Sequence, residues 1–413
     1  MSKLIKINLG DCGVQFIDGD RSAKYPKREE FVDSGVLFLN AESINGGSIS
    51  IDHANKITEE KYRSIKKGRF KASDILLTTR GNGVGKAALV SKSIYGIINA
   101  QMLIIRAPSD LINPSFLYYY ISSSTIYSYI LNFSSGAAQP QIPIRDLKKI
   151  PIFLPPIETQ NKIAAILSAY DELIENNQRR IALLEKMAEE LYREWFVRFH
   201  FPNWQTAEFE KGIPKGWEKV SLSDIVEITM GQSPSSEFYN DLGNGLPFHQ
   251  GVGTYGERFP RNEIYCSEKG RIAQKGDILF SVRAPVGRLN IASEKSIIGR
   301  GLSALRHKNN KQSYLFYTLK SLFKDEDIIG NGAIFNSVSK DELLKFSLLL
   351  PQADLINEFE NYAQKIDKQI ASLFDANKNL AKTKNMLLPR LISGKLPVDQ
   401  LDIQTPPTPQ KLA

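Results

Sequence analysis

The sequence predicts an α+β protein made of two similar mixed α/β domains and two long helices that pack on each other as an antiparallel coiled coil. Three observations support this fold class: an internal repeat, two long segments with few glycines and prolines, and heptad spacing of apolar residues within those segments. With 413 residues, of which 42% are hydrophobic, the chain is long enough for two cores, because single domains usually contain about 100 to 200 residues.

The repeat is visible in two pairs of matching segments. Residues 74–80 (DILLTTR) match residues 277–283 (DILFSVR), and residues 136–155 match residues 332–351 at a constant offset of 196. Each copy alternates β-rich stretches with Gly, Pro and Asn turns and contains one short tyrosine-rich helix. The sequence therefore predicts the same mixed domain twice.

A long helix is expected after each copy, around residues 164–198 and 359–388. Residues spaced by seven form a mostly apolar series in the first helix, and the series 196 residues later is fully apolar. These helix-pairing positions are Ile163, Tyr170, Asn177, Leu184 and Leu191 in the first helix, and Phe359, Ile366, Leu373, Leu380 and Leu387 in the second. Buried asparagines at positions 177 and 377 would cost stability but would fix the register. The alternative is that each stripe is simply the core-facing side of an ordinary helix.

These patterns divide the chain into five parts. A Pro-rich tail follows the second helix, and we expect it to be disordered. The expected parts are a first mixed domain at 1–155, a helical region at 156–200, a second mixed domain at 201–352 that includes a linker at 201–211, a second helical region at 353–397, and the tail at 398–413.

The overall charge favours a polyanionic partner such as nucleic acid. The chain has 53 Lys and Arg against 45 Asp and Glu, a net charge of +8. Its two cysteines, Cys12 and Cys266, are too isolated for a disulfide framework or a metal cluster. No apolar run approaches the roughly 18 residues of a membrane span, and the N-terminal residues do not resemble a signal peptide. We therefore expect a cytoplasmic protein without membrane association.

The motifs of catalysis are not found in the sequence. The stretch 81–86 (GNGVGK) resembles a phosphate-binding loop, but Arg80 stands where that motif needs glycine and Ala87 stands where it needs Ser or Thr. A turn between two strands explains it better. The four histidines show no metal-ligand spacing, and neither a nuclease carboxylate cluster nor a methyltransferase motif is present. The sequence predicts no catalytic residue, no metal site and no cofactor on this chain.

Polar side chains in the predicted loops are suited to DNA. Arginine can donate two hydrogen bonds to guanine, asparagine and glutamine can pair with adenine in the same way, and lysine can neutralise phosphate. Solvated loop residues or local caps are the alternative for any one of them. The candidates are Arg80, Asn82, Lys86, Asn99 and Gln101 in the first copy, and Arg283, Arg288, Arg300 and Ser303 in the second.

Several stretches resemble the specificity subunits of type I restriction–modification systems, and the resemblance covers nearly all of residues 1–400. The matching stretches are GIPKGW at 212–217, GDIL at 276–279 followed by VRAPVG at 282–287, LPPIETQ at 154–160, and LPRLISGKL at 388–396. The chain departs from this pattern at its start, because residues 3–7 are not preceded by a Pro-Lys-Gly-Trp stretch like that at 214–217.

The resemblance implies that each mixed domain is a target-recognition domain that reads one half of a split site in double-stranded DNA. It also implies that the helices separate these domains and recruit two methyltransferase subunits, with restriction subunits completing the complex. S-adenosylmethionine and ATP would then belong to the partner chains, where a target adenine would be flipped out of the stack. Two half-sites one helical turn apart lie about 34 Å from each other. The resemblance adds Tyr25, Lys27, Asn40, His249, Gln250, Tyr255 and Arg258 to the DNA-binding candidates.

Two other functions remain open at this point. The chain could be a DNA methyltransferase or nuclease that acts alone, which turnover by the purified chain would reveal. It could also be a structural scaffold with incidental basic charge, which would show neither base preference nor DNA binding that falls steeply with salt.

Overall fold

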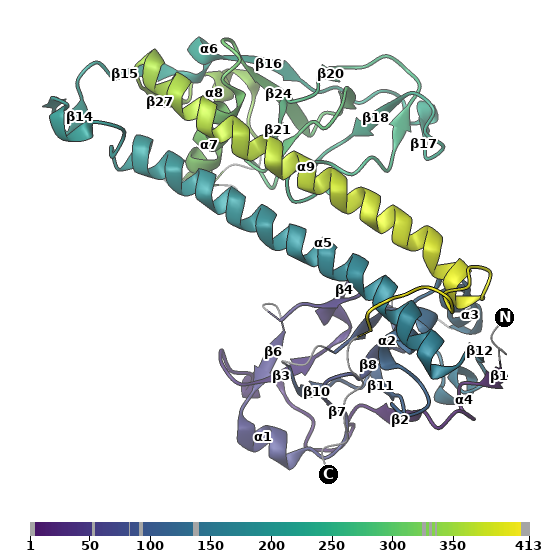
Figure 1. Ribbon diagram of the computed structural model, residues 1–413. Helices are drawn as coiled ribbons and strands as arrows, with labels where there is room; N and C mark the ends of the chain where they lie inside the picture. Colours follow the sequence, from purple (N-terminus) through teal and green to yellow (C-terminus); the bar gives the residue numbers. More distant parts are fainter. Residues whose placement is uncertain are drawn as a thin grey trace. The chain divides into compact units, whose positions relative to one another are not determined.

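The computed structural model describes residues 5–51, 54–81, 83–90, 94–134, 140–323, 328–329, 333–334 and 337–405. The chain forms two compact units (Figure 1). Unit 1 contains Met1–Asn177 and Ala376–Ala413, and unit 2 contains Gln178–Asp375. Unit 1 is therefore built from two segments that are distant in the sequence, whereas unit 2 is one continuous segment.

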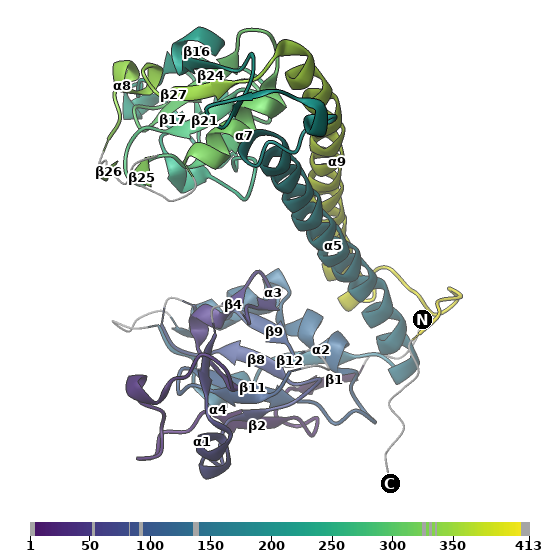
Figure 2. The same cartoon turned by 90° about the vertical axis from the view of Figure 1, so that its left-hand side faces the viewer.

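Unit 1 contains two four-stranded sheets. The first sheet has the order β2-β11-β8-β9, is antiparallel throughout, and can be followed in Figure 2. The second has the order β6-β3-β10-β7, in which β10 pairs parallel with β3. The strands are β1 (Ile5–Asn8), β2 (Gln15–Asp18), β3 (Val36–Leu39), β4 (Ile44–Asn45), β5 (Ser48–Ile49), β6 (Asn55–Ile57), β7 (Arg69–Phe70), β8 (Ile75–Thr78), β9 (Ala87–Leu89), β10 (Gly96–Ile98), β11 (Met102–Arg106) and β12 (Pro151–Leu154), and the short helices are α1 (Glu59–Ser64), α2 (Pro114–Ile121), α3 (Ser124–Ser134) and α4 (Ile144–Leu147).

Unit 2 repeats this topology, with β16-β24-β21-β22 as its first sheet and β17-β19-β18-β23-β20 as its second. In both units the segment that opens the domain pairs with the strand before the long helix, as β1 with β12 and as β15 with β27. The strands are β13 (Phe209–Glu210), β14 (Ile213–Pro214), β15 (Glu218–Ser221), β16 (Val226–Met230), β17 (Tyr239–Asn240), β18 (Leu246–His249), β19 (Tyr265–Cys266), β20 (Ile272–Ala273), β21 (Ile278–Ser281), β22 (Leu289–Ile291), β23 (Ser296–Ile298), β24 (Leu302–His307), β25 (Ile328–Ile329), β26 (Ala333–Ile334) and β27 (Ser347–Leu350), and the short helices are α6 (Leu222–Ile225), α7 (Gln312–Leu322) and α8 (Lys340–Leu344). The predicted repeat of a mixed domain is confirmed.

One ion pair occupies the same place in both first sheets. The Nε atom of Arg106 lies 2.7 Å from Oδ1 of Asp74, and the Nε atom of Arg306 lies 2.7 Å from Oδ1 of Asp277. Both aspartates are buried, and each also accepts a hydrogen bond from the backbone N–H three residues earlier. Because a buried carboxylate needs such partners, this pair holds the start of β8 and of β21 against the neighbouring strand.

Two long helices contribute to both units. Helix α5 (Ile157–Tyr192) continues into a π-helical turn at Arg193–Val197, and α9 (Ala353–Ile392) starts soon after Pro351. Both begin before residues 164 and 359, around which the long helices were expected, but within the expected helical regions 156–200 and 353–397. The two helices run antiparallel in unit 1, since Asn177 contacts Asn377 while Asp171 contacts Lys384. They also do so in unit 2, since Trp195 packs on Phe359 while Glu185 and Asp367 share Arg258.

Most of the predicted helix-pairing positions pack in the cores of the two units, while Tyr170, Asn177 and Leu380 lie outside these cores. The buried positions are Ile163, Asn177, Phe359, Ile366 and Leu373, and the partly buried ones are Tyr170, Leu184, Leu191, Leu380 and Leu387.

Among the described residues, no helix is long and apolar enough to cross a membrane.

The two asparagines of the predicted seam meet in unit 1. Asn177 donates a hydrogen bond from Nδ2 to Oδ1 of Asn377 over 2.8 Å, and Nδ2 of Asn377 lies 3.4 Å from the carbonyl oxygen of Ile174. A shift of either helix by one turn would leave both amides without these partners. The pair is therefore suited to fix the register of α5 against α9.

The predicted disorder of residues 398–413 is wrong for the first part of that segment. Val398 is buried in the core of unit 1, and Nζ of Lys162 donates hydrogen bonds to the carbonyl oxygens of Asp399 and Leu401 over 2.8 and 2.9 Å. These contacts hold the chain beyond α9 against the start of α5. Residues 406–413 of the predicted tail lie outside the described residues.

We expect Asn177→Ala to lower the free energy of unfolding by about 1 to 3 kcal/mol, because it leaves the Asn377 amide partly buried without its partner. The double variant Asn177→Leu/Asn377→Leu should recover most of this loss, since both polar groups are then removed. Urea unfolding followed by circular dichroism measures both changes. The neighbouring exposed Asn176→Ala is the control, and an equal loss in that variant would contradict a role for the buried pair.

Candidate nucleic-acid interface

Three loops meet where the two sheets of unit 1 join. The backbone N–H of Asn99 donates to the carbonyl oxygen of Leu39 over 2.8 Å, and the N–H of Thr79 donates to the carbonyl oxygen of Gln101 over 2.8 Å. The loop after β3, the loop between β8 and β9, and the loop between β10 and β11 are therefore joined by backbone hydrogen bonds. We call this meeting point the loop junction of unit 1.

Unit 2 has the equivalent loop junction. The N–H of Gly299 donates to the carbonyl oxygen of His249 over 2.9 Å, and the N–H of Gly301 donates to that of Gln250 over 3.2 Å. The N–H of Val282 donates to the carbonyl oxygen of Gly301 over 3.0 Å. These bonds place Gln250, Arg283 and Arg300 on neighbouring loops, as the equivalent bonds do for Asn40, Arg80 and Gln101 in unit 1.

Both junctions require a glycine that the sequence analysis did not identify. A Cβ atom on Gly19 would lie 2.1 Å from the carbonyl oxygen of Asn99, and one on Gly231 would lie 2.1 Å from that of Gly299. A side chain at either position would push the loops apart. The spacing between Gly19 and Gly231 differs from the 196-residue offset of the repeat, so the sequence contained no signal that pairs them.

A fourth segment crosses each junction. Arg80 forms an isolated antiparallel bridge with Gln141, and Arg283 forms one with Ser337. In unit 1, Arg80 and Gln141 also line a hollow of about 220 Å³ together with Arg21, which pairs with Asp18 over 3.0 Å. Arg21 therefore joins the candidate set, although its sequence position did not suggest it.

The charged and amide side chains at the junctions face solvent. Lys86, Gln101, Gln250, Arg283 and Arg300 are exposed, and Arg80 is partly exposed. Neither Arg283 nor Arg300 forms a salt bridge with a carboxylate in the part of the chain that the structure describes. Such side chains can exchange water for base edges or phosphates at little desolvation cost. Arg288 is also exposed, and Asn82 lies outside the described residues.

Four candidates are buried, which contradicts their prediction as DNA contacts. Asn99, His249, Tyr255 and Ser303 point into the protein, and the side chain of Ser303 is 0% exposed. Nδ1 of His249 lies 3.1 Å from Oγ1 of Thr254, and burial lowers the pKa of His249 to about 4. These residues support the loops from inside.

The remaining candidates of unit 1 lie on the second sheet and the loops beside it. Asn40 accepts hydrogen bonds from the backbone N–H groups of Glu42 and Ser43, so it caps the 3-10 turn at Ala41–Ser43. Tyr25 packs edge-on against Phe38 with 5.5 Å between ring centroids. Lys27 is exposed. Local contacts therefore account for the positions of Asn40 and Tyr25.

The comparisons with known proteins agree with this architecture. Residues 15–186 and 214–390 both match the family model described as "Type I restriction modification DNA specificity domain". The chain belongs to this family. The putative type I restriction enzyme MjaX specificity subunit of Methanocaldococcus jannaschii is 31% identical over 375 residues, which are 88% of each chain.

More distant specificity subunits have the same extent. The type I restriction enzyme HindI specificity subunit of Haemophilus influenzae is 21% identical over 92% of this chain and 98% of its own. The crystal structure of the type I restriction-modification system S subunit from M. genitalium has a TM-score of 0.56 at 17% identity, covering 94% of this chain and 96% of that one. This likeness supports the fold.

Arg258 has a structural position in the second specificity domain, which contradicts its prediction as a DNA contact. Its side chain is 1% exposed and forms ion pairs with Asp367 of α9 and, over 3.4 Å, with Glu185 of α5. Its guanidinium lies 4.5 Å from the ring centroid of Phe316. The sequence placed Arg258 in a polar loop, but it did not show that the loop turns toward the helices.

Unit 1 contains the same kind of contact. The hydroxyl of Tyr119 on α2 donates to Oδ2 of Asp171 over 2.7 Å, and Nζ of Lys384 lies 2.5 Å from Oδ1 of the same aspartate. In unit 2, the hydroxyl of Tyr317 on α7 donates to Asp367 over 2.9 Å. Burial, together with the nearby Asp171, raises the pKa of Tyr119, so its hydroxyl stays a donor.

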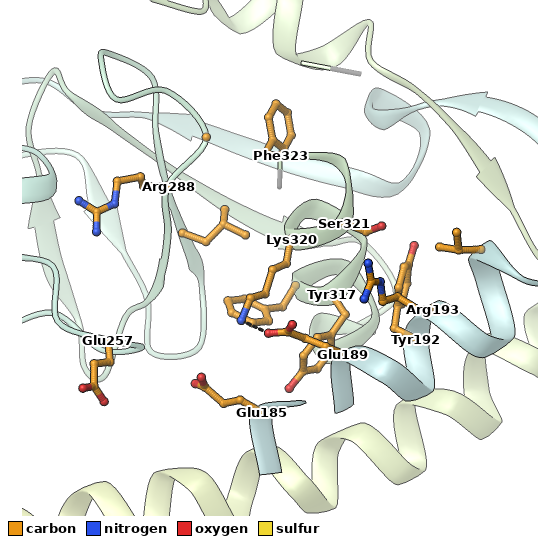
Figure 3. A pocket seen from close by; sticks show the side chains of 14 residues that line it. Glu185, Glu189, Tyr192, Arg193, Glu257, Arg288, Tyr317, Lys320, Ser321 and Phe323 are labelled. Carbon is orange, nitrogen blue, oxygen red and sulfur yellow. Dashed lines mark ion pairs between the residues drawn. The ribbon is translucent and has the colours of Figure 1, made fainter. Parts of the chain in front are cut away.

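A hollow of about 380 Å³ lies beside this contact in the second domain (Figure 3). Figure 3 shows Lys320 paired with Glu189, with Glu185 and Arg193 also pointing toward the space. The lining mixes acidic and basic groups, so it lacks the uniform positive charge that phosphate binding favours. In the described residues, no group of three or more His, Cys, Asp or Glu side chains could hold a metal.

We expect Arg258→Met to destabilise unit 2 by about 3 to 5 kcal/mol, because it leaves the Asp367 and Glu185 carboxylates without their cation. Urea unfolding followed by tryptophan fluorescence reports on unit 2, since Trp195, Trp204 and Trp217 all lie there. The control is Arg261→Met on the same loop, which replaces an exposed arginine and should change stability by less than about 0.5 kcal/mol. Unchanged stability combined with lost base preference would instead restore Arg258 as a DNA contact.

Proposed function

We propose that this chain is the DNA sequence-specificity subunit of a type I restriction–modification complex, and that each loop junction reads one half of a bipartite target. The observation that carries this proposal is the repeated junction. The same loops meet through equivalent backbone hydrogen bonds in both specificity domains, and the side chains there that face solvent mostly differ, although Arg80 and Arg283 are equivalent arginines. A constant framework with variable exposed residues is suited to reading two different sequences.

The exposed side chains have the chemistry of base recognition. Arg283 and Arg300 of unit 2 can each donate two hydrogen bonds to the N7 and O6 atoms of guanine. In unit 1, Gln101 can pair with adenine in the same way, and Arg80 can pair with guanine. Because the two sets differ, we propose that the two domains read different half-sites.

The long helices are proposed to hold the domains apart as an antiparallel coiled coil and to bind two methyltransferase subunits. Their antiparallel contacts within each unit and the asparagine pair support this arrangement. Large apolar side chains on α5 also face solvent, namely Leu173, Leu183 and Met187. A protein partner would bury such a surface.

Catalysis is proposed to reside on the partner chains. S-adenosylmethionine would bind to the methyltransferase subunits, while ATP and the nuclease would belong to the restriction subunits. This chain would position a target adenine that a methyltransferase subunit flips out of the duplex. Mapping methylated adenines in DNA from cells that express the complex tests the proposal, and a split motif with two defined halves and an unread spacer is the expected result.

We expect Arg283→Ala to weaken binding of the assembled complex to its target by about 1 to 3 kcal/mol, with base preference lost only in the half-site that unit 2 reads. Competition binding with duplexes that carry single substitutions in each half-site measures both effects. Arg261→Ala, which removes an exposed arginine paired with Glu263, is the matched control. An equal loss on every sequence would show that Arg283 contacts a phosphate, and no loss on any would remove it from the interface.

A further inference from the structure

A short turn with two basic side chains lies next to the loop junction in each unit. In unit 1 this basic turn contains Lys66 and Lys67, and the carbonyl oxygen of Gly68 accepts a hydrogen bond from the N–H of Ile98 over 2.9 Å. Ile98 is the last residue of β10, so the turn is bonded to the strand that enters the loop at Asn99.

The basic turn of unit 2 has the same bond at the same place. It contains Lys269 and Arg271, and the carbonyl oxygen of Arg271 accepts a hydrogen bond from the N–H of Ile298 over 2.9 Å. Ile298 ends β23 and precedes the loop that carries Arg300. Two units that differ in most loop residues therefore both present a pair of cations beside the junction.

Close packing fixes each turn against the junction. A Cβ atom on Gly68 would lie 3.1 Å from Cα of Gly19, the glycine that contacts the loop at Asn99. In unit 2, a Cβ atom on Gly270 would lie 2.5 Å from the side chain of Ile297. There is no room for the turns to move inward, so the long basic side chains project from a fixed backbone.

A separate arginine keeps the turn of unit 1 in shape. The guanidinium of Arg69 donates to the carbonyl oxygens of Ile65 and Tyr62 over 2.7 and 2.8 Å and lies 4.5 Å from the ring centroid of Tyr62. Through these contacts Arg69 stabilises the turn. Lys66 and Lys67 remain exposed on the turn that Arg69 anchors.

The four cations of the basic turns have no structural role that the contacts reveal. Lys66, Lys67, Lys269 and Arg271 are exposed, and none forms a salt bridge with a carboxylate among the residues described here. Cations that are held beside a base-reading surface but offset from it lie where the sugar–phosphate strands flank a groove. Their long side chains can reach phosphates without entering the groove.

We propose that the two basic turns bind the phosphate backbone of duplex DNA next to each half-site, and so add affinity and orientation without contributing to base choice. This inference rests on the proposed function, since it places DNA at the loop junctions. Each neutralised phosphate makes the slope of log K against log salt steeper by about 0.9. A pair of contacts in one turn therefore contributes about 1.8 to that slope.

The test uses the complete methyltransferase complex with Lys66→Gln/Lys67→Gln or with Lys269→Gln/Arg271→Gln in this chain. Either variant should bind target and unrelated duplexes more weakly by a similar factor, and its salt slope should be smaller by about 1.8. Because the affinity of the wild-type complex falls more steeply with salt, the ratio of variant to wild-type Kd should decrease about 10-fold between 50 and 200 mM salt. The preference for target over unrelated DNA should change less than about 2-fold.

The variant Lys211→Gln/Lys219→Gln is the control for loss of positive charge alone, because it removes two exposed lysines near β14 and β15. The conservative Lys66→Arg/Lys67→Arg should retain the wild-type salt slope, which separates lost charge from a disturbed turn. An unchanged slope in the glutamine variants, or an equal change in the lysine 211 and 219 control, would overturn the proposal. So would a loss confined to target DNA.

The salt slope can be read on any duplex, so this test and that of the proposed function fail separately. A wild-type complex without base preference would overturn the proposed reading of half-sites. The slope would still decide whether the basic turns bind phosphates.

Discussion

Each unit contains a partly buried aspartate of a long helix that binds a tyrosine of a short helix and a cation. In unit 1 the aspartate is Asp171 and the cation is Lys384 of α9, while in unit 2 they are Asp367 and Arg258. A carboxylate removed from water is costly unless a cation and hydrogen bonds compensate it. This contact joins the short helix of each unit to a long helix and so helps to fix the position of one against the other.

The two cations come from different parts of the chain, although the aspartates stand 196 residues apart in the repeat. Lys384 belongs to the opposite long helix, whereas Arg258 belongs to a loop of the domain itself. The requirement for a positive charge has been kept while its source has changed. The ion pair of Asp74 with its arginine, in contrast, recurs with the same residue types at Asp277, because both partners lie on paired strands whose register is the same in each unit.

Patterns that repeat could be predicted from the sequence, whereas burial of single polar side chains could not. The offset of 196 and the heptads correctly indicated two mixed domains and two long helices, and they singled out Asn177 and Asn377, which pair in the structure. Local sequence does not encode whether the side chain of a candidate residue is exposed or buried. Arg283 faces solvent, whereas Arg258 turns toward the helices and Ser303 lies on a buried strand. A polar residue in a turn-rich stretch has no local signal for which side of the loop it occupies.

Under the proposed function, the loop junction explains how such a domain can change its target without refolding. Backbone groups join the loops, as in the bonds from Thr79 to Gln101 and from Val282 to Gly301, and these bonds do not depend on which side chains stand at positions 101 and 301. Close approaches restrict the sequence at Gly19 and Gly231, and in unit 2 also at Gly299 and Gly301. Exposed positions can therefore exchange glutamine for arginine at little cost in stability. The residues proposed to recognise DNA are therefore different from the groups that hold the loops together. A domain type that recognises many different DNA sequences requires this separation.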